Sequence, residues 1–316
     1  MNRQTLASLQ VCCGVDTFEV TTNKPLLVSI GGITSKGHLQ PCNTHGLQFK
    51  YKVNPDKVID GASGNIDKLK AVFEFVKKCF DGATELFISR IDYRFDDMSN
   101  DYNRFYKLNR LLLSMLAVCF NSSNNYSSSD LLTAEKLTVR FDCDHSDLHI
   151  SGEYYNKERQ EPSGEVKTRL ELRSRQLYIP FLDGSDYESF LLAEWLERIN
   201  EALTADTFNS VIQICTEGII EGYKTNIEEC GNLTEYFVSV RDNIYTTRQL
   251  SNLYGILGRA DTARQSAYKY RHGDKKTKGR KLPCFSLADL ILYRDKLEQA
   301  AFKFFETQSD ELTKVA

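Results

Sequence analysis

The chain has 316 residues, with 40 Lys and Arg against 43 Asp and Glu, and a formal net charge of -3. Hydrophobic residues make up 41% and charged residues 26%, ordinary values that exclude a wholly disordered chain. The longest apolar run, residues 111–120, is about half a membrane span, so we expect neither a transmembrane helix nor a secretory signal. The nine cysteines include no Cys-x-x-Cys pair, which favours small buried hydrophobes in a reducing, cytoplasmic protein.

The first half of the sequence alternates strand and helix patterns. Hydrophobic periodicity predicts helices at about residues 69–80 and 102–120. Period-two alternation or short β-type runs predict strands at residues 17–21, 26–30, 47–53, 86–96, 136–141, 148–155 and 166–173. Short connections between the later strands favour antiparallel neighbours. We therefore expect residues 1–184 to form an α+β domain, with one antiparallel sheet and helices packed on one face.

Alternation also assigns the polar side chains of these strands to one face. Asp92 and Asp96 share a side with the arginines at 90 and 94, while Ile91 and its alternate neighbours point the other way. The same rule gives a polar row on each of two later strands. These rows are His149, Ser151, Glu153, Tyr155 and Lys157 on one strand, and Arg169, Glu171 and Arg173 on the other.

Carboxylates gathered on such a face are typical ligands of Mg²⁺ or Mn²⁺, which prefer oxygen donors. Such an ion polarises a phosphodiester, and a nearby tyrosine can act as a nucleophile on phosphorus. Asp92 and Asp96 lie roughly 13 Å apart along a strand, so we choose Asp92 as the ligand. The competing interpretation is a solvated face with cross-strand ion pairs, which needs no metal.

Three blocks together resemble the replication initiation factor family, the rolling-circle initiators of small plasmids and mobile elements. The blocks are Arg90–Asp97, Glu153–Arg159 and Thr168–Arg173. Gene-II-type phage initiators and some conjugative-transposon relaxases have a similar layout. The resemblance covers about residues 15–178 and implies a sheet-based nicking domain related to HUH endonucleases. The chain departs from those enzymes because none of its five His forms a His-hydrophobic-His motif.

The resemblance implies a role for several residues of this chain. Tyr155, in the Tyr-Asn-Lys segment with Lys157, would cut one DNA strand and remain linked to the 5′ phosphate, rather than the adjacent Tyr154. Asp92 and Glu171 would hold the metal, and Glu153 on the same face completes the expected ligand set. Arg90, Arg169 and Arg173 would contact the DNA strand.

The second half, residues 185–316, is predicted to be helical and to contain a DNA-binding module. A pattern of cap, helix and turn at residues 245–258, followed by a helix at about 260–270, is consistent with a helix-turn-helix. A basic segment overlaps it, and a local positive charge of this size indicates contact with phosphate. Its cations are Arg259, Arg264, Lys269, Arg271, Lys275, Lys276, Lys278, Arg280 and Lys281.

These features predict a rolling-circle initiator that nicks and rejoins one strand at an origin. The alternatives are a conjugative relaxase and a non-catalytic, sequence-specific DNA-binding regulator of a mobile element. The expected partners are single-stranded and duplex origin DNA, a host helicase and a polymerase. The resemblance also implies the helicase and a homodimer, and no membrane partner is expected.

Overall fold

The computed structural model describes the chain in segments that include most residues of the predicted strands. The described residues are 6, 9–38, 49–98, 102–120, 137–142, 149–155, 168–180, 187–226, 236, 240, 243–256 and 284–306. Among them, no helix is long and apolar enough to cross a membrane.

The described strands form a seven-stranded sheet in the order β2-β3-β1-β4-β7-β6-β5, and every neighbouring pair is antiparallel. This confirms the predicted antiparallel sheet of an α+β fold. The strands are β1 (Val11–Thr22), β2 (Ile33–His38), β3 (Phe49–Val53), β4 (Leu86–Asp97), β5 (Leu137–Asp142), β6 (His149–Tyr155) and β7 (Arg169–Pro180).

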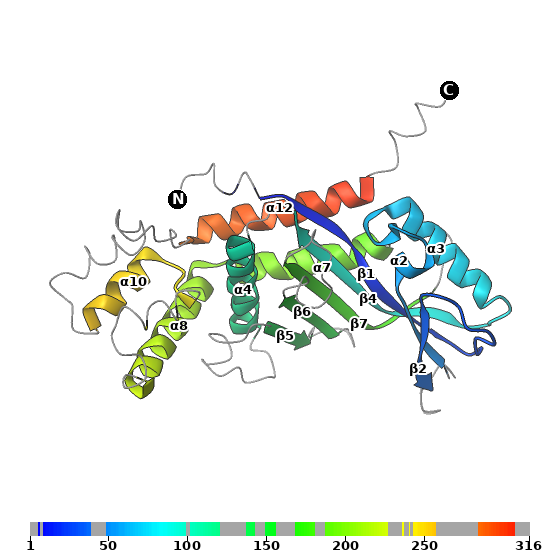
Figure 1. The fold of residues 1–316 in the computed structure, drawn as a ribbon, viewed down its shortest axis with the longest axis horizontal. Helices are drawn as coiled ribbons and strands as arrows, with labels where there is room; N and C mark the ends of the chain where they lie inside the picture. Colours follow the sequence, from blue (N-terminus) through cyan, green and yellow to red (C-terminus); the bar gives the residue numbers. More distant parts are fainter. Residues whose placement is uncertain are drawn as a thin grey trace, which may run out of the picture.

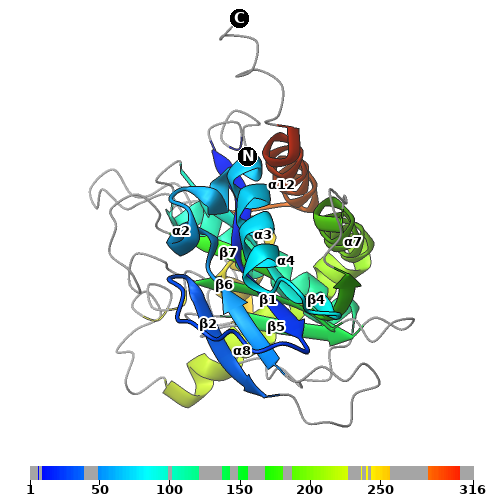
Figure 2. The same ribbon diagram turned by 90° about the vertical axis from the view of Figure 1, so that its right-hand side faces the viewer.

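Helices cover the apolar face of this sheet (Figures 1 and 2). The helices are α2 (Pro55–Val58), α3 (Ile66–Cys79), α4 (Tyr102–Cys119), α7 (Tyr187–Ala202), α8 (Ala205–Asn226), α10 (Thr247–Tyr254) and α12 (Leu287–Glu306), with a 3₁₀ turn, η1, at Ala62–Gly64. Helix α12 packs on β1, α4 on β5 and β6, and α7 on β7. Helix α3 reaches the same face, because Phe73 packs against Phe18 of β1 with ring centroids 4.7 Å apart.

Local sequence explains why these helices begin where they do. Asn65 caps α3 by accepting a hydrogen bond from the Lys68 backbone N–H at 3.0 Å. Helix α12 starts with a capping box, in which Ser286 and Asp289 bond each other's backbone N–H groups at 2.8 and 3.3 Å. Thr246 caps α10, because its Oγ1 accepts a hydrogen bond from the Gln249 backbone N–H at 2.9 Å.

Two strand predictions near the N-terminus need correction. The predicted strand at residues 26–30 is wrong, because this segment is irregular and exposes Leu27 at 85% and Val28 at 64%. The strand lies instead at Ile33–His38, after a turn at Gly31–Gly32 in which Gly32 has a φ of +84°. The strand predicted at residues 17–21 is also longer, since β1 begins at Val11.

The helical second half packs partly on the sheet and partly beyond it. Helix α8 contacts α4, and α10 contacts α8 at the end of the molecule opposite β2 (Figure 1). The buried Lys107 of α4 donates a hydrogen bond to the Ile244 carbonyl at 3.0 Å, just before α10. Helix α10 matches the helix predicted within residues 245–258. The helix predicted at about 260–270 and the basic segment lie outside the described residues.

Candidate functional site

The strand register arranges polar residues of β6, β7, β4 and β1 in parallel rows on the face opposite α3, α4, α7 and α12, and η1 reaches this face beside Gly14 and Arg94. One row contains Glu153, Glu171 and Arg94, which are successive cross-strand partners. The next contains Ser151, Arg173, Asp92 and Thr17, and another contains Tyr155, Arg169 and Asp96. The predicted sharing of one polar face by these strands is thus confirmed by the backbone register.

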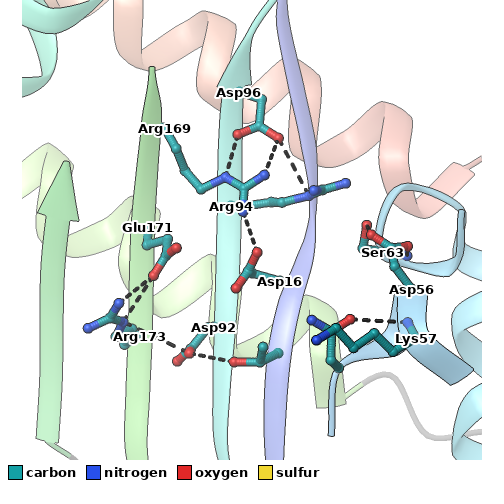
Figure 3. A network of polar contacts seen from close by, with 12 residues as sticks. Asp16, Asp56, Lys57, Ser63, Asp92, Arg94, Asp96, Arg169, Glu171 and Arg173 are labelled. Carbon is teal, nitrogen blue, oxygen red and sulfur yellow. Dashed lines mark hydrogen bonds and ion pairs between the residues drawn. The ribbon is translucent and has the colours of Figure 1, made fainter. Parts of the chain in front are cut away.

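Arg173 connects the three acids that were predicted to be metal ligands. Its guanidinium donates to Glu153 Oε2 at 2.9 Å. It also donates to Glu171 Oε2 at 2.5 Å, and its Nε lies 3.9 Å from Asp92 Oδ2 (Figure 3). The three carboxylates are at most 3% exposed. Burial works against the charge of Arg173, but the neighbouring carboxylates outweigh it and raise the pKa of the guanidinium.

A second cation holds Asp92 from the other side. Arg90 donates two hydrogen bonds to this carboxylate, at 2.7 and 2.5 Å, and Thr17 of β1 donates a third at 2.8 Å. Arg90 also lies 3.1 Å from Glu19, whose other oxygen is 2.7 Å from Lys50 Nζ. Burial opposes ionisation of Glu19, yet Lys50 and Arg90 together hold its pKa below the ordinary value.

Arg169 and Asp96 form a separate buried pair. Arg169 donates to both Asp96 oxygens, at 2.7 and 3.0 Å, and also bonds Asp16, while Arg94 approaches Asp96 at 3.6 Å (Figure 3). The side chain of Arg169 is only 3% exposed. The guanidinium predicted to contact DNA is therefore directed at two carboxylates in this structure.

Two tyrosines, Tyr154 and Tyr155, follow each other on β6. Tyr154 is fully buried on the helix side, where its ring packs edge-on against Tyr106 with centroids 4.9 Å apart. Burial raises the pKa of its hydroxyl far above the usual value, which makes it a poor nucleophile. The Tyr155 side chain lies outside the described part, but its backbone is opposite Arg169. This register puts residue 155 in the row of Arg169 and Asp96, and the alternation of a pleated strand predicts the polar face for it.

The acidic residues of this face lie at different distances from the backbone position of Tyr155. Glu153 lies two residues along the same strand, roughly 7 Å away, and Glu171 is diagonal to Tyr155 on β7. Asp96 lies in the same row, two strands across and so roughly 10 Å away, whereas Asp92 is two strands across and four residues along, roughly 16 Å away. The acids at 153 and 171 are therefore better placed than Asp92 to act beside the tyrosine.

The acids suit a divalent ion in type but not in arrangement. Carboxylate oxygens are the donors that Mg²⁺ and Mn²⁺ prefer. Within the described residues, however, no group of three or more His, Cys, Asp or Glu side chains converges to hold an ion. The guanidinium of Arg173 lies between Asp92, Glu153 and Glu171 instead.

Several predicted site residues lie outside the described part, and several described ones were not predicted. Outside it lie Lys157, the side chain of His149, and the basic residues Arg264, Lys269, Arg271, Lys275, Lys276, Lys278 and Arg280. Sequence reasoning missed the contributions of Glu19, Lys50 and Thr17 to the site. Glu19 could have been found, because it lies between Phe18 and Val20, the apolar residues of a short alternating strand.

Comparisons with known proteins give little support for assigning a family. No family model matches the sequence, and no curated protein matches it. One solved structure that resembles the chain is a rolling circle replication initiator protein from Geobacillus stearothermophilus, at 14% identity and a TM-score of 0.25. The match covers 52% of this chain and 75% of that protein. Likeness at this level is no basis for an argument about activity.

Proposed function

We propose that this chain cuts and rejoins one strand of DNA through Tyr155, as an initiator of rolling-circle replication. The observation that supports the proposal most directly is the burial of Tyr154 against Tyr106 on the helix side. Alternation along β6 then predicts that Tyr155, in register with Arg169, belongs to the face rich in acids and arginines. A tyrosine on such a face has both neighbouring carboxylates and cations that can contact phosphate.

The proposed reaction is a transesterification that conserves one phosphodiester bond. The Tyr155 oxygen attacks phosphorus, a new O–P bond forms, and the bond between phosphorus and the 3′ oxygen breaks. The phenolic proton is transferred through a carboxylate or water, and the departing 3′ oxygen ends as a hydroxyl. Glu153, two residues from Tyr155 on β6, is the carboxylate that would accept this proton. The partly exposed Arg173 and Arg94 would offset the negative charge on the phosphate.

The remaining parts of the proposal concern partners. The basic segment after α10 would bind the origin duplex, and the free 3′ hydroxyl would prime a host polymerase behind a helicase. Mg²⁺ or Mn²⁺ would add positive charge at the phosphate, and a homodimer would present two such sheets. Each of these is an expectation from the sequence, and a relaxase acting in conjugation would use the same chemistry.

The test is formation of a covalent protein–DNA adduct. Single-stranded DNA from the neighbourhood of the encoding gene is incubated with the protein, in Mn²⁺ or in EDTA, and denatured before electrophoresis. We expect an adduct with the unchanged protein and with Tyr154→Phe, because that change keeps the buried ring. We expect none with Tyr155→Phe, which removes the attacking oxygen.

Two results would contradict this assignment. Loss of the adduct in Tyr154→Phe but not in Tyr155→Phe would place the nucleophile on the helix side. Absence of an adduct with every tested segment, from a protein that folds and binds the same DNA, would favour the non-catalytic regulator. The extensive pairing of Asp92, Glu153 and Glu171 with arginines is the observation that favours this second candidate.

A further inference from the structure

The charged side chains of the β2–β3 hairpin and its flanks are all basic. Residues 24–55 contain four lysines and neither Asp nor Glu, in a chain whose net charge is -3. Both described strands of this hairpin belong to the sheet, and β2 forms one edge of it. The hairpin therefore concentrates positive charge at one side of the molecule, at the opposite end from α10 (Figure 1).

Three of these lysines lie on the polar face that contains the candidate site. Lys52 is the cross-strand partner of Glu19, and Lys50 is 2.7 Å from the Glu19 carboxylate. Lys36 lies close enough for its charge to help lower the pKa of Glu19. Glu19 itself is 5% exposed, whereas Lys36 is exposed and Lys50 is 32% exposed. The acid is thus covered, and the cations are at the surface.

The lysines continue a line of arginines across the sheet. Arg173 on β7 and Arg90 on β4 are 18% and 16% exposed, and β1 separates Arg90 from the lysines of β3 and β2. Four strand spacings separate β7 from β2, which is roughly 19 Å. Helices α3, α4, α7 and α12 pack on the opposite face, so they do not cover this line.

We propose that the β2–β3 hairpin binds the single-stranded DNA beside the cut, with backbone phosphates at Lys36, Lys50 and Lys52. This inference rests on the proposed function and extends it from the nick to the path of the strand. Cations on successive strands of a sheet follow the sheet's twist. A flexible single strand can follow the same twist, whereas duplex DNA is stiff and resists bending.

The test measures noncovalent binding by fluorescence anisotropy in the Tyr155→Phe protein. The probes are oligothymidylates of about 8 to about 24 nucleotides, spanning the usual range of single-strand site sizes. The lysine variant combines Lys36→Gln, Lys50→Gln and Lys52→Gln. The control combines Lys70→Gln, Lys78→Gln and Lys303→Gln, exposed lysines on α3 and α12 with the same total charge change. Circular dichroism confirms that both variants fold.

We expect the lysine variant to bind the longer oligonucleotides roughly 10–100-fold more weakly at low salt. Its plot of log affinity against log salt should be shallower by about 2, because each phosphate contact contributes about 0.7 for single strands. The control should retain the unchanged protein's affinity and slope. Binding of a hairpin duplex of equal charge should change much less.

Equal weakening in the lysine variant and the control would overturn the inference, and so would an unchanged salt slope. Equal loss of single-strand and duplex binding would assign the hairpin to duplex DNA and overturn it as well. Failure of the adduct test is a separate result. A protein that makes no adduct but shows the predicted slope change would lose the proposed nicking function and keep this binding surface.

Discussion

Arg173 contributes one guanidinium to three buried carboxylates, so its removal should be costly. Arg173→Gln leaves Glu153 and Glu171 without this cation and weakens the environment of Asp92. We expect a loss of about 2–4 kcal/mol in the free energy of unfolding, because breaking a buried ion pair leaves its carboxylates charged and without their cation. The range is lower than for a fully buried pair, since Arg173 itself is partly exposed. Urea unfolding followed by circular dichroism measures this value.

The matched control is Arg198→Gln on α7. Arg198 also contacts two acids, Glu194 at 3.3 Å and Glu201 at 3.0 Å, whose side chains are 25% and 44% exposed, unlike the buried acids around Arg173. Arg198 also lies 5.5 Å from the centroid of the Phe120 ring. Such surface pairs are worth about 1 kcal/mol or less. A similar cost for both substitutions would mean that the network around Arg173 contributes no more than an ordinary surface pair.

At the scale of elements, η1 approaches β1 closely at Gly14. A Cβ atom at this position would overlap the Ser63 carbonyl oxygen, and that backbone is held by a 2.8 Å bond from the Ser63 N–H to Asp56. We expect Gly14→Ala to destabilise the protein by about 1–3 kcal/mol, because the backbone of η1 must move. Thermal unfolding measures the change.

Gly255→Ala supplies the comparison for this prediction. Gly255 has a helical φ of -63°, and among the described residues no atom beyond its chain neighbours and its own helix backbone lies within 4 Å of its hypothetical Cβ. Alanine should therefore leave stability unchanged or raise it by up to about 1 kcal/mol. If Gly14→Ala behaves like Gly255→Ala, the close approach of η1 to β1 does not constrain the fold.

Periodicity predicted the elements that have one apolar and one polar face, and it failed for the others. Strand β4 alternates clearly, so its faces were correctly assigned. Strand β2 contains one buried apolar residue, Ile33, because it is an edge strand, and edge strands bury little. The apolar residues at 26–30 resembled a strand in composition, although Pro25 precedes them and Leu27 and Val28 are exposed.

The candidate site was predictable in its residue types but not in its pairings. Alternation along each strand was enough to place Asp92, Glu153 and Glu171 on one face. The partners depend on register between distant strands, as in the hydrogen bond from Thr17 to Asp92, 75 residues apart. No local pattern encodes that register, so the central position of Arg173 could not be foreseen.

For the whole molecule, one core includes residues from both predicted regions. Trp195 of α7 is fully buried beside Gly152 of β6, and α12 packs on β1. We therefore expect residues 1–184 and 185–316 to unfold in one transition. Trp195 is the single tryptophan, so its fluorescence reports on the contact between α7 and the sheet.

The measurement compares urea unfolding by Trp195 fluorescence with far-ultraviolet circular dichroism. Coincident curves would show that the sheet and the helices on it unfold cooperatively. Two separated transitions would show that the predicted division at residue 184 is also a boundary between independent folding units.

Gly152 has a consequence for the two adjacent tyrosines. A Cβ there would lie 2.5 Å from Leu113 of α4, so this site on β6 accepts only the smallest residue without adjustment. Slippage of β6 by a single residue would bring Ser151 or Glu153 to that place, forcing a polar group into hydrocarbon. The same slippage would exchange the sides of Tyr154 and Tyr155. Gly152 thereby holds β6 in the register that keeps Tyr154 on the helix side of the sheet.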